Sequence, residues 1–397
     1  MKHPPLIFIL ITIFIDVLGY GMMIPLLPFF VQRQGGGAAM AGTLASFYAF
    51  LQLFSGPLLG SLSDRLGRKP ILLACLFGTA VAYALFGLAD SLAFLFLAVT
   101  LDGLTGNNLT TAHAYIADVT PPGERSRGLS LAGAAFGLGV MAGPVLSGLL
   151  SGYGLSVPAF AAAGIAFANT LYGLFFLPES LAPEKRARHP VSFNTFAQLK
   201  SLFDLPALRG LLVALFLLNL AFAGLQTNFP LFSNARFDWT PRQNGFFFAF
   251  VGVVAVFVQG FLYLRLQPKL GEGRMAALGL VFLALGMAGI ALTPIAWTLY
   301  PFVAVASLGS GSSIPSLSGL VSARAGEARQ GQLMGGMQTL LGLTTIFGPT
   351  LAGLSFERIG VGAPYWIGSG LALLALLAFW RSDPQPFDPA QDRPVTD

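Results

Sequence analysis

Twelve mostly apolar runs, each long enough to cross a lipid bilayer, divide this chain from end to end. A spanning helix needs about 20 such residues, and it satisfies its own backbone hydrogen bonds because lipid offers no partners. Only 10% of the 397 residues are charged, which is too few to cover a soluble protein. The sequence therefore predicts an all-α membrane protein with helices near 5–30, 40–62, 70–89, 92–116, 127–152, 157–178, 207–232, 243–264, 274–293, 297–321, 330–354 and 361–381.

Positive charge is concentrated on one side of the predicted membrane. With both termini in the cytoplasm, 18 of the 22 Lys and Arg residues fall in cytoplasmic segments, and the outside loops hold only Arg33, Arg236, Arg242 and Arg358. This positive-inside bias explains the net charge of +5 without a nucleic-acid partner. The first run has no small-residue cleavage site before the next run, so we read it as the first span and not as a signal peptide. We expect a multi-pass protein of the cell (inner) membrane.

The two halves of the chain resemble each other at an offset of about 205 residues. GLGVMAGPVLSGL, from Gly137, aligns with GLTTIFGPTLAGL, from Gly342, and Gly56 and Gly67 align with Gly260 and Gly271. Two glycine-rich helices can align by chance, but a shared Gly-Pro pair in equivalent spans argues against chance. Parallel six-helix repeats are a transporter architecture, with the substrate site between the halves.

The repeat also suggests domain borders and helix contacts. We predict an N-terminal six-helix bundle at 1–178, a cytoplasmic linker at 179–206, a C-terminal six-helix bundle at 207–381 and a cytoplasmic tail at 382–397. Small residues let membrane helices approach closely. Close helix packing is expected at Gly137, Gly143, Pro144, Gly348 and Pro349.

Three segments of the N-terminal half resemble a known family. GSLSDRLGRK, from Gly60, is similar to the signature loop of the major facilitator superfamily. IDVLGYGMMIPLLP (15–28) and AYIADVTPPGERSRG (114–128) resemble the twelve-helix drug:proton antiporters, and among them the tetracycline efflux antiporters. The resemblance implies the major facilitator fold, with twelve helices in two pseudo-symmetric six-helix bundles, and proton-coupled export.

In the resembled family the signature loop takes part in a charge cluster. The acid and the arginine of the loop meet an acid at the foot of span 4, and the loop acid also faces the start of span 11, near Gln330 in this chain. The resemblance thus implies a conformational latch, and the alternative is that the loop cations only anchor the orientation. The latch residues would be Gly60, Asp64, Arg65, Gly67, Arg68 and Asp118.

Two carboxylic acids, Asp16 and Asp102, fall well inside predicted spans. A carboxylate in hydrocarbon costs about 2.5–3.5 kcal/mol on insertion scales, so such acids are functional candidates by default. The resembled antiporters usually carry an arginine in span 4 where this chain has Val99, which puts their coupling scheme in doubt here. On one continuous helix, His113 would lie within about 20° of the azimuth of Asp102. We predict proton coupling by Asp16, Asp102 and His113, and the alternative for each is a structural hydrogen bond.

Neutral polar side chains are candidates for contacting a substrate. Spans 1, 4, 7 and 10 line the central cavity in the resembled fold, and ligand sites combine apolar walls with a few placed polar groups. Most phenylalanines are expected to serve packing. The candidate substrate-binding residues are Asn107, Asn108, Asn219, Gln226, Asn228 and Gln338.

Sequence patterns of other function classes are absent. There is no Walker loop, HExxH, Cys/His cluster or nucleophile elbow, so we expect no enzyme, no cofactor and no metal site. The leading hypothesis is a monomeric secondary active transporter that exports hydrophobic or cationic drug-like small molecules in exchange for protons, by alternating access within the lipid bilayer. Proton-coupled uptake, metabolite or lipid transport, and a non-transporting membrane receptor are the alternatives.

Overall fold

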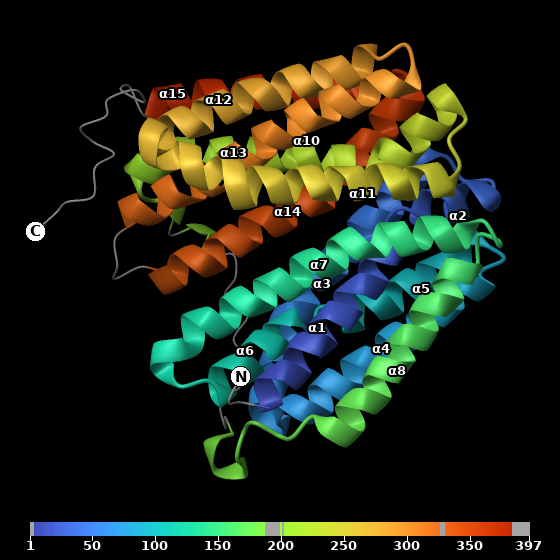
Figure 1. Ribbon diagram of the computed structural model, residues 1–397, viewed down its shortest axis with the longest axis vertical. Coiled ribbons are helices and arrows are strands. Elements are labelled where there is room, and N and C mark those ends of the chain that lie inside the picture. The colour runs from blue at the N-terminus through green and yellow to red at the C-terminus, as the bar shows by residue number, and fades with distance from the viewer. Residues whose placement is uncertain (1–3, 187–198, 201, 326–329, 383–397) are drawn as a thin grey trace, which may run out of the picture. The chain divides into compact units, whose positions relative to one another are not determined.

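The computed structural model describes residues 4–186, 199–200, 202–325 and 330–382, and these contain helices and no strand (Figure 1). The helices follow the predicted apolar runs because each run can satisfy its backbone only internally. They are α1 (Pro4–Met23), α2 (Leu27–Arg33), α3 (Ala38–Leu66), α4 (Arg68–Leu88), α5 (Leu92–Thr105), α6 (Leu109–Val119), α7 (Arg125–Ser151), α8 (Val157–Phe176), α10 (Pro206–Phe237), α11 (Pro241–Phe257), α12 (Leu264–Leu292), α13 (Leu299–Ala325), α14 (Gln330–Arg358) and α15 (Ala363–Ser382).

Ten stretches of the described residues are long and apolar enough to cross a membrane. One of them, Pro241–Leu292, has 52 residues, which is about 78 Å of helix and too long for one crossing. It contains Gly271, whose φ of 78° interrupts the helix, so it comprises two of the predicted spans. The serine-rich α13 is not among the ten, although its 27 residues also reach across a bilayer. The prediction of twelve spans is confirmed.

The fourth predicted span is not one continuous helix. It is divided into α5 and α6 by Gly106, Asn107 and Asn108. Glycine loses much backbone entropy in a helix, and the Asn side chain competes for backbone hydrogen bonds, so this triplet favours an interruption. The expectation that Asp102 and His113 share one stripe of a single helix is therefore wrong.

The chain forms two compact units that exchange short segments. Unit 1 comprises Met1–Gly36, Phe47–Phe193 and Trp239–Ala249, and unit 2 comprises Gly37–Ser46, Asn194–Asp238 and Phe250–Asp397. The start of α3 thus belongs to unit 2, and the start of α11 belongs to unit 1. The bundle borders inferred from the sequence stay a prediction.

Glycine contacts build unit 1. A Cβ on Gly143 of α7 would lie 2.5 Å from the carbonyl carbon of Gly21 in α1, so this approach requires glycine at position 143. Further along α7, a Cβ on Gly245 of α11 would lie 2.6 Å from the Cα of Gly148. The close packing expected at Gly137 is wrong, because a Cβ there would meet no atom of the described residues within 4 Å.

Unit 2 repeats these contacts about 205 residues later. A Cβ on Gly348 of α14 would lie 2.8 Å from the Cβ of Ala223 in α10, and a Cβ on Gly42 of α3 would collide with the carbonyl oxygen of Pro349. Thr350 also donates to Ser46 Oγ from its backbone nitrogen, at 3.1 Å. The internal repeat of the sequence therefore corresponds to a repeat of helix contacts.

Candidate functional site

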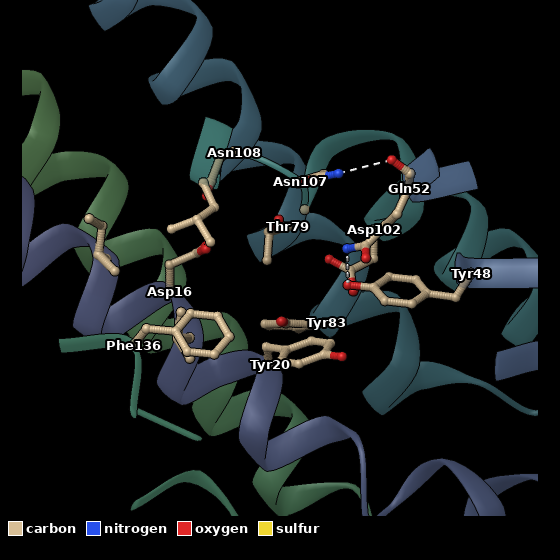
Figure 2. Close-up of a pocket in the computed structure, with 14 residues that line it drawn as sticks. Asp16, Tyr20, Tyr48, Gln52, Thr79, Tyr83, Asp102, Asn107, Asn108 and Phe136 are labelled. Atoms are coloured by element: carbon tan, nitrogen blue, oxygen red, sulfur yellow. Dashed lines mark hydrogen bonds between the residues drawn. The ribbon is translucent and has the colours of Figure 1, made fainter. Parts of the chain in front are cut away.

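Unit 1 contains a partly open polar cavity of about 170 Å³ between α1, α3, α4, α7 and the α5–α6 interruption (Figure 2). Both acids of the predicted spans line it. The polar and aromatic lining residues are Asp16, Tyr20, Tyr48, Gln52, Thr79, Tyr83, Asp102, Asn107, Asn108 and Phe136. The structure therefore brings together four of the predicted site residues, Asp16, Asp102, Asn107 and Asn108.

Both carboxyl groups of the cavity keep an unpaired oxygen. Asp102 is 5% exposed and faces the hydroxyls of Thr79 and Tyr48, and Asp16 faces the side-chain amide of Asn108. One oxygen of each carboxyl group is buried without a hydrogen-bond partner among the described residues. A buried unpaired polar atom costs about 1–3 kcal/mol. The cavity is therefore suited to receive a proton, water or a ligand at these oxygens.

Helix α3 braces the α5–α6 interruption. Ser55 Oγ donates to the carbonyl oxygen of Gly103 at 2.8 Å, and Asn107 Nδ2 donates to the carbonyl oxygen of Gln52 at 2.9 Å (Figure 2). Gly56 makes the second bond possible, because a Cβ there would lie 2.5 Å from Asn107 Nδ2. The interruption thus has a defined conformation, and it places Asn108 beside Asp16.

The tyrosines of the cavity were not among the predicted site residues. Three lining pairs stand four residues apart on their helices, namely Asp16 and Tyr20 on α1, Tyr48 and Gln52 on α3, and Thr79 and Tyr83 on α4. Residues four apart share one helix face. Such polar pairs inside apolar spans are the sequence signal that could have identified them.

His113 and Val99 lie outside the cavity lining. His113 lies in α6, after the interruption in the sequence, and it is half-buried. It does not line the cavity that Asp102 lines. Val99 is buried at 2% exposure in α5. The position where the resembled antiporters carry an arginine therefore holds a packed apolar side chain.

The predicted substrate residues of the second half do not border this cavity. Asn219 donates to the carbonyl oxygen of Leu215 in its own helix at 2.8 Å, Asn228 is buried at 3% exposure, and Gln338 is exposed. Gln226 belongs to α10, but its side chain lies outside the described part of the structure. Among the residues whose side chains the structure describes, none from spans 7 and 10 lines the unit 1 cavity.

The signature loop, Gly60–Lys69, forms the expected charge cluster at the α3–α4 turn. The Arg68 guanidinium is 2.5 Å from Asp64 Oδ1 and 3.1 Å from Asp118 Oδ2, and it donates to Ser63 Oγ at 2.7 Å. Arg68 is buried at 7% exposure. The two carboxylates compensate the charge of the buried guanidinium, and charge-assisted hydrogen bonds offset the cost of removing it from water.

The comparisons with known proteins cover nearly the whole chain. A model of the Major Facilitator Superfamily matches residues 9–341 and 265–395. The chain belongs to the major facilitator superfamily. It is 31% identical to the class C tetracycline resistance protein of Escherichia coli over 95% of this chain and 96% of that protein. It is 30% identical to multidrug resistance protein 2 of Bacillus subtilis (strain 168), over 94% of each chain.

A solved transporter structure has the same fold as this chain. The human organic anion transporter MFSD10 (TETRAN) superposes with a TM-score of 0.69 at 26% identity, over 95% of this chain and 99% of that chain. The resemblance inferred from the signature loop is thus confirmed. As a major facilitator protein the chain is a multi-pass membrane transporter and not an enzyme.

In this major facilitator protein Glu179 ties the segment after α8 to the signature loop. Its Oε1 accepts from the backbone nitrogen of Arg68 at 2.9 Å, and its Oε2 accepts from that of Lys69 at 3.3 Å, which caps the start of α4. Gly67 has a φ of 110°, which favours glycine, and Gly271, its repeat partner, has a φ of 78°. The two halves therefore share this backbone turn, although Pro268 stands where the first half has Asp64.

Replacing Glu179 with alanine is expected to lower the free energy of unfolding by about 1 kcal/mol, because two backbone N–H groups at the start of α4 lose their acceptor. Thermal unfolding of the purified protein in detergent measures the change. Glu184→Ala, at an exposed position five residues later, is the matched control. Equal unfolding temperatures for the two variants would contradict the capping role.

Proposed function

We propose that this protein is a proton-coupled efflux antiporter for hydrophobic or cationic small molecules. The observation that carries the proposal is the pairing of Asp16 and Asp102 in one cavity of unit 1. No Lys, Arg or His lines that cavity among the described residues. Two carboxylates that share one cavity repel each other when both are ionised, and a proton or a cationic ligand removes that repulsion.

Proton exchange at these acids would drive transport by changing which conformation is favoured. A site can shift a conformational equilibrium only by differing in affinity between the two states. In the proposed cycle a proton enters from outside, neutralises an acid and later leaves to the cytoplasm, as the substrate moves outward. The cluster of Asp64, Arg68 and Asp118 is proposed to latch the cytoplasmic side during one half of this cycle.

The relatives support the export direction. The names of the Escherichia coli and Bacillus subtilis proteins refer to resistance against tetracycline and against multiple drugs, and resistance by a membrane transporter requires outward movement. Uptake or metabolite transport is the alternative within transporters, since the human relative is an organic anion transporter. A non-transporting receptor is the alternative from another class.

Flux through reconstituted protein distinguishes these functions. Liposomes containing the purified protein, a trapped pH-sensitive dye and a panel of hydrophobic and cationic compounds are subjected to pH gradients of either sign. We expect substrate to move against the proton flow and to dissipate the gradient. Movement of substrate together with protons would indicate uptake, and binding without flux in a counterflow assay would indicate a receptor.

A further inference from the structure

We infer that the unit 1 cavity binds a small protonated amine with a single ring-sized apolar group, and that Asp102 sets this preference. The inference rests on the proposed transport function and specifies its substrate class. Three features of the cavity carry it: its charge, its aromatic walls and its volume.

The charge of the cavity favours an ammonium group. Asp16 Oδ1 and Asp102 Oδ1 are buried without hydrogen-bond partners among the described residues, and both residues line the cavity. A protonated amine offers up to three N–H donors and a positive charge. Water could supply donors to the same atoms, but only a proton or a cation such as an ammonium group also neutralises the carboxylate charge.

The aromatic walls also suit a cation. The rings of Tyr20 and Tyr48 stack at 6.1 Å between centroids with an interplanar angle of 22°. Tyr83 lies over Gly19, where a Cβ would be 2.8 Å from its ring, and Figure 2 shows its ring beside that of Tyr20 in the same cavity. Aromatic faces attract ammonium groups through their quadrupole, so these rings and the carboxyl groups select the same charge.

The volume limits the apolar part of the ligand. A cavity of about 150 Å³ in another protein accommodates benzene, and this one has about 170 Å³. It therefore has room for one aromatic ring with a short amine arm, and the rest of a larger compound would lie outside it.

Asp102 adds a second carboxyl group to the cavity, beside that of Asp16. The titratable groups at the site are Asp16 and Tyr20 on α1, Tyr48 on α3, Tyr83 on α4 and Asp102 on α5, with the Cys75 thiol of α4 near Asp16. None of these side chains is positively charged at any pH. An incoming ammonium group therefore competes with protons for the same carboxylate oxygens, and amine binding releases protons.

Three matched probes test the inference. 2-Phenylethylamine, 2-phenylethanol and phenylacetate share one ring and differ in charge. Calorimetric titration of the full chain in nanodiscs, in two buffers of different ionisation enthalpy, gives affinity and proton release together. We expect the amine to bind at least about tenfold more tightly than the alcohol, with proton release for the amine alone and no binding of phenylacetate.

Variants locate the preference. Asp102→Asn is expected to reduce the preference for the amine over the alcohol to less than about threefold. Asp90→Asn, at an exposed position between α4 and α5, is the charge-matched control. Should Asp102→Asn fail to fold, Tyr20→Leu is expected to weaken amine binding selectively, and Tyr20→Phe to preserve it.

The outcomes separate this inference from the proposed function. Equal affinity for amine and alcohol, or no binding of either while a larger compound still moves against protons, would overturn the inference and leave the antiporter intact. Selective amine binding in a protein without any pH-driven flux would support the amine site and overturn the proposed antiport.

Discussion

Asp102→Asn is expected to abolish substrate accumulation driven by a pH gradient. Asparagine matches aspartate in shape and can still contact Thr79 and Tyr48, the hydroxyl groups that Asp102 faces, but it cannot exchange a proton. Without differential proton binding the gradient no longer shifts the conformational equilibrium, so the accumulation ratio falls to about one. Liposomes with an imposed pH gradient and a trapped dye measure both substrate and proton movement.

Asp90→Asn again serves as the control, because it removes one carboxyl group from an exposed position. Both variants have to elute as monodisperse protein in detergent before their transport is compared. Unchanged proton-coupled flux in Asp102→Asn would exclude Asp102 from the coupling and leave Asp16 as the single acid of the cavity. Loss of flux in the Asp90 variant would show that the assay responds to general charge.

Gly143→Ala should destabilise the protein by about 3 kcal/mol, at the upper end of the usual cost of overpacking. The added Cβ would meet the carbonyl carbon and Cα of Gly21 at 2.5 and 2.6 Å. Both atoms belong to the backbone of α1, so no side-chain rotation relieves the contact, and α7 has to move away. Thermal unfolding in detergent, followed by the fraction of monodisperse protein, detects the change.

Gly137→Ala is the matched control because it makes the same change in the same helix. A Cβ at Gly137 would meet no atom within 4 Å, and alanine favours a helix over glycine by up to about 1 kcal/mol. Its unfolding temperature should stay the same or rise. If both variants lose stability alike, the close approach of α7 and α1 is not what Gly143 provides.

The spanning helices and the charge cluster could be predicted from sequence for different reasons. Apolar runs of the right length have one stable conformation in lipid, so their positions follow from composition alone. The cluster of Asp64, Arg68 and Asp118 was predicted by resemblance, and the ion pairs of Arg68 agree with it. Neither inference required knowledge of how the helices pack.

The cavity was only half predictable. Asp16 and Asp102 stood out because acids are rare inside spans, whereas the local signal for Tyr20, Tyr48 and Tyr83 is weaker: each has a polar partner four residues away on the same helix face. Their role depends on which helix faces meet, and that is decided by glycine contacts between distant segments. The interruption at Gly106–Asn108 carried a local signal, but the apolar pattern around it concealed the signal.

The exchange of segments between the units has a consequence for biogenesis. Unit 1 includes Trp239–Ala249, which a ribosome makes well after the first six spans. Until then, the face of α7 that later receives Gly245 has to stay in contact with lipid, the insertion machinery or another nascent helix. Insertion of the first half can therefore precede its final assembly, and a half-chain expressed alone would lack part of its own packing.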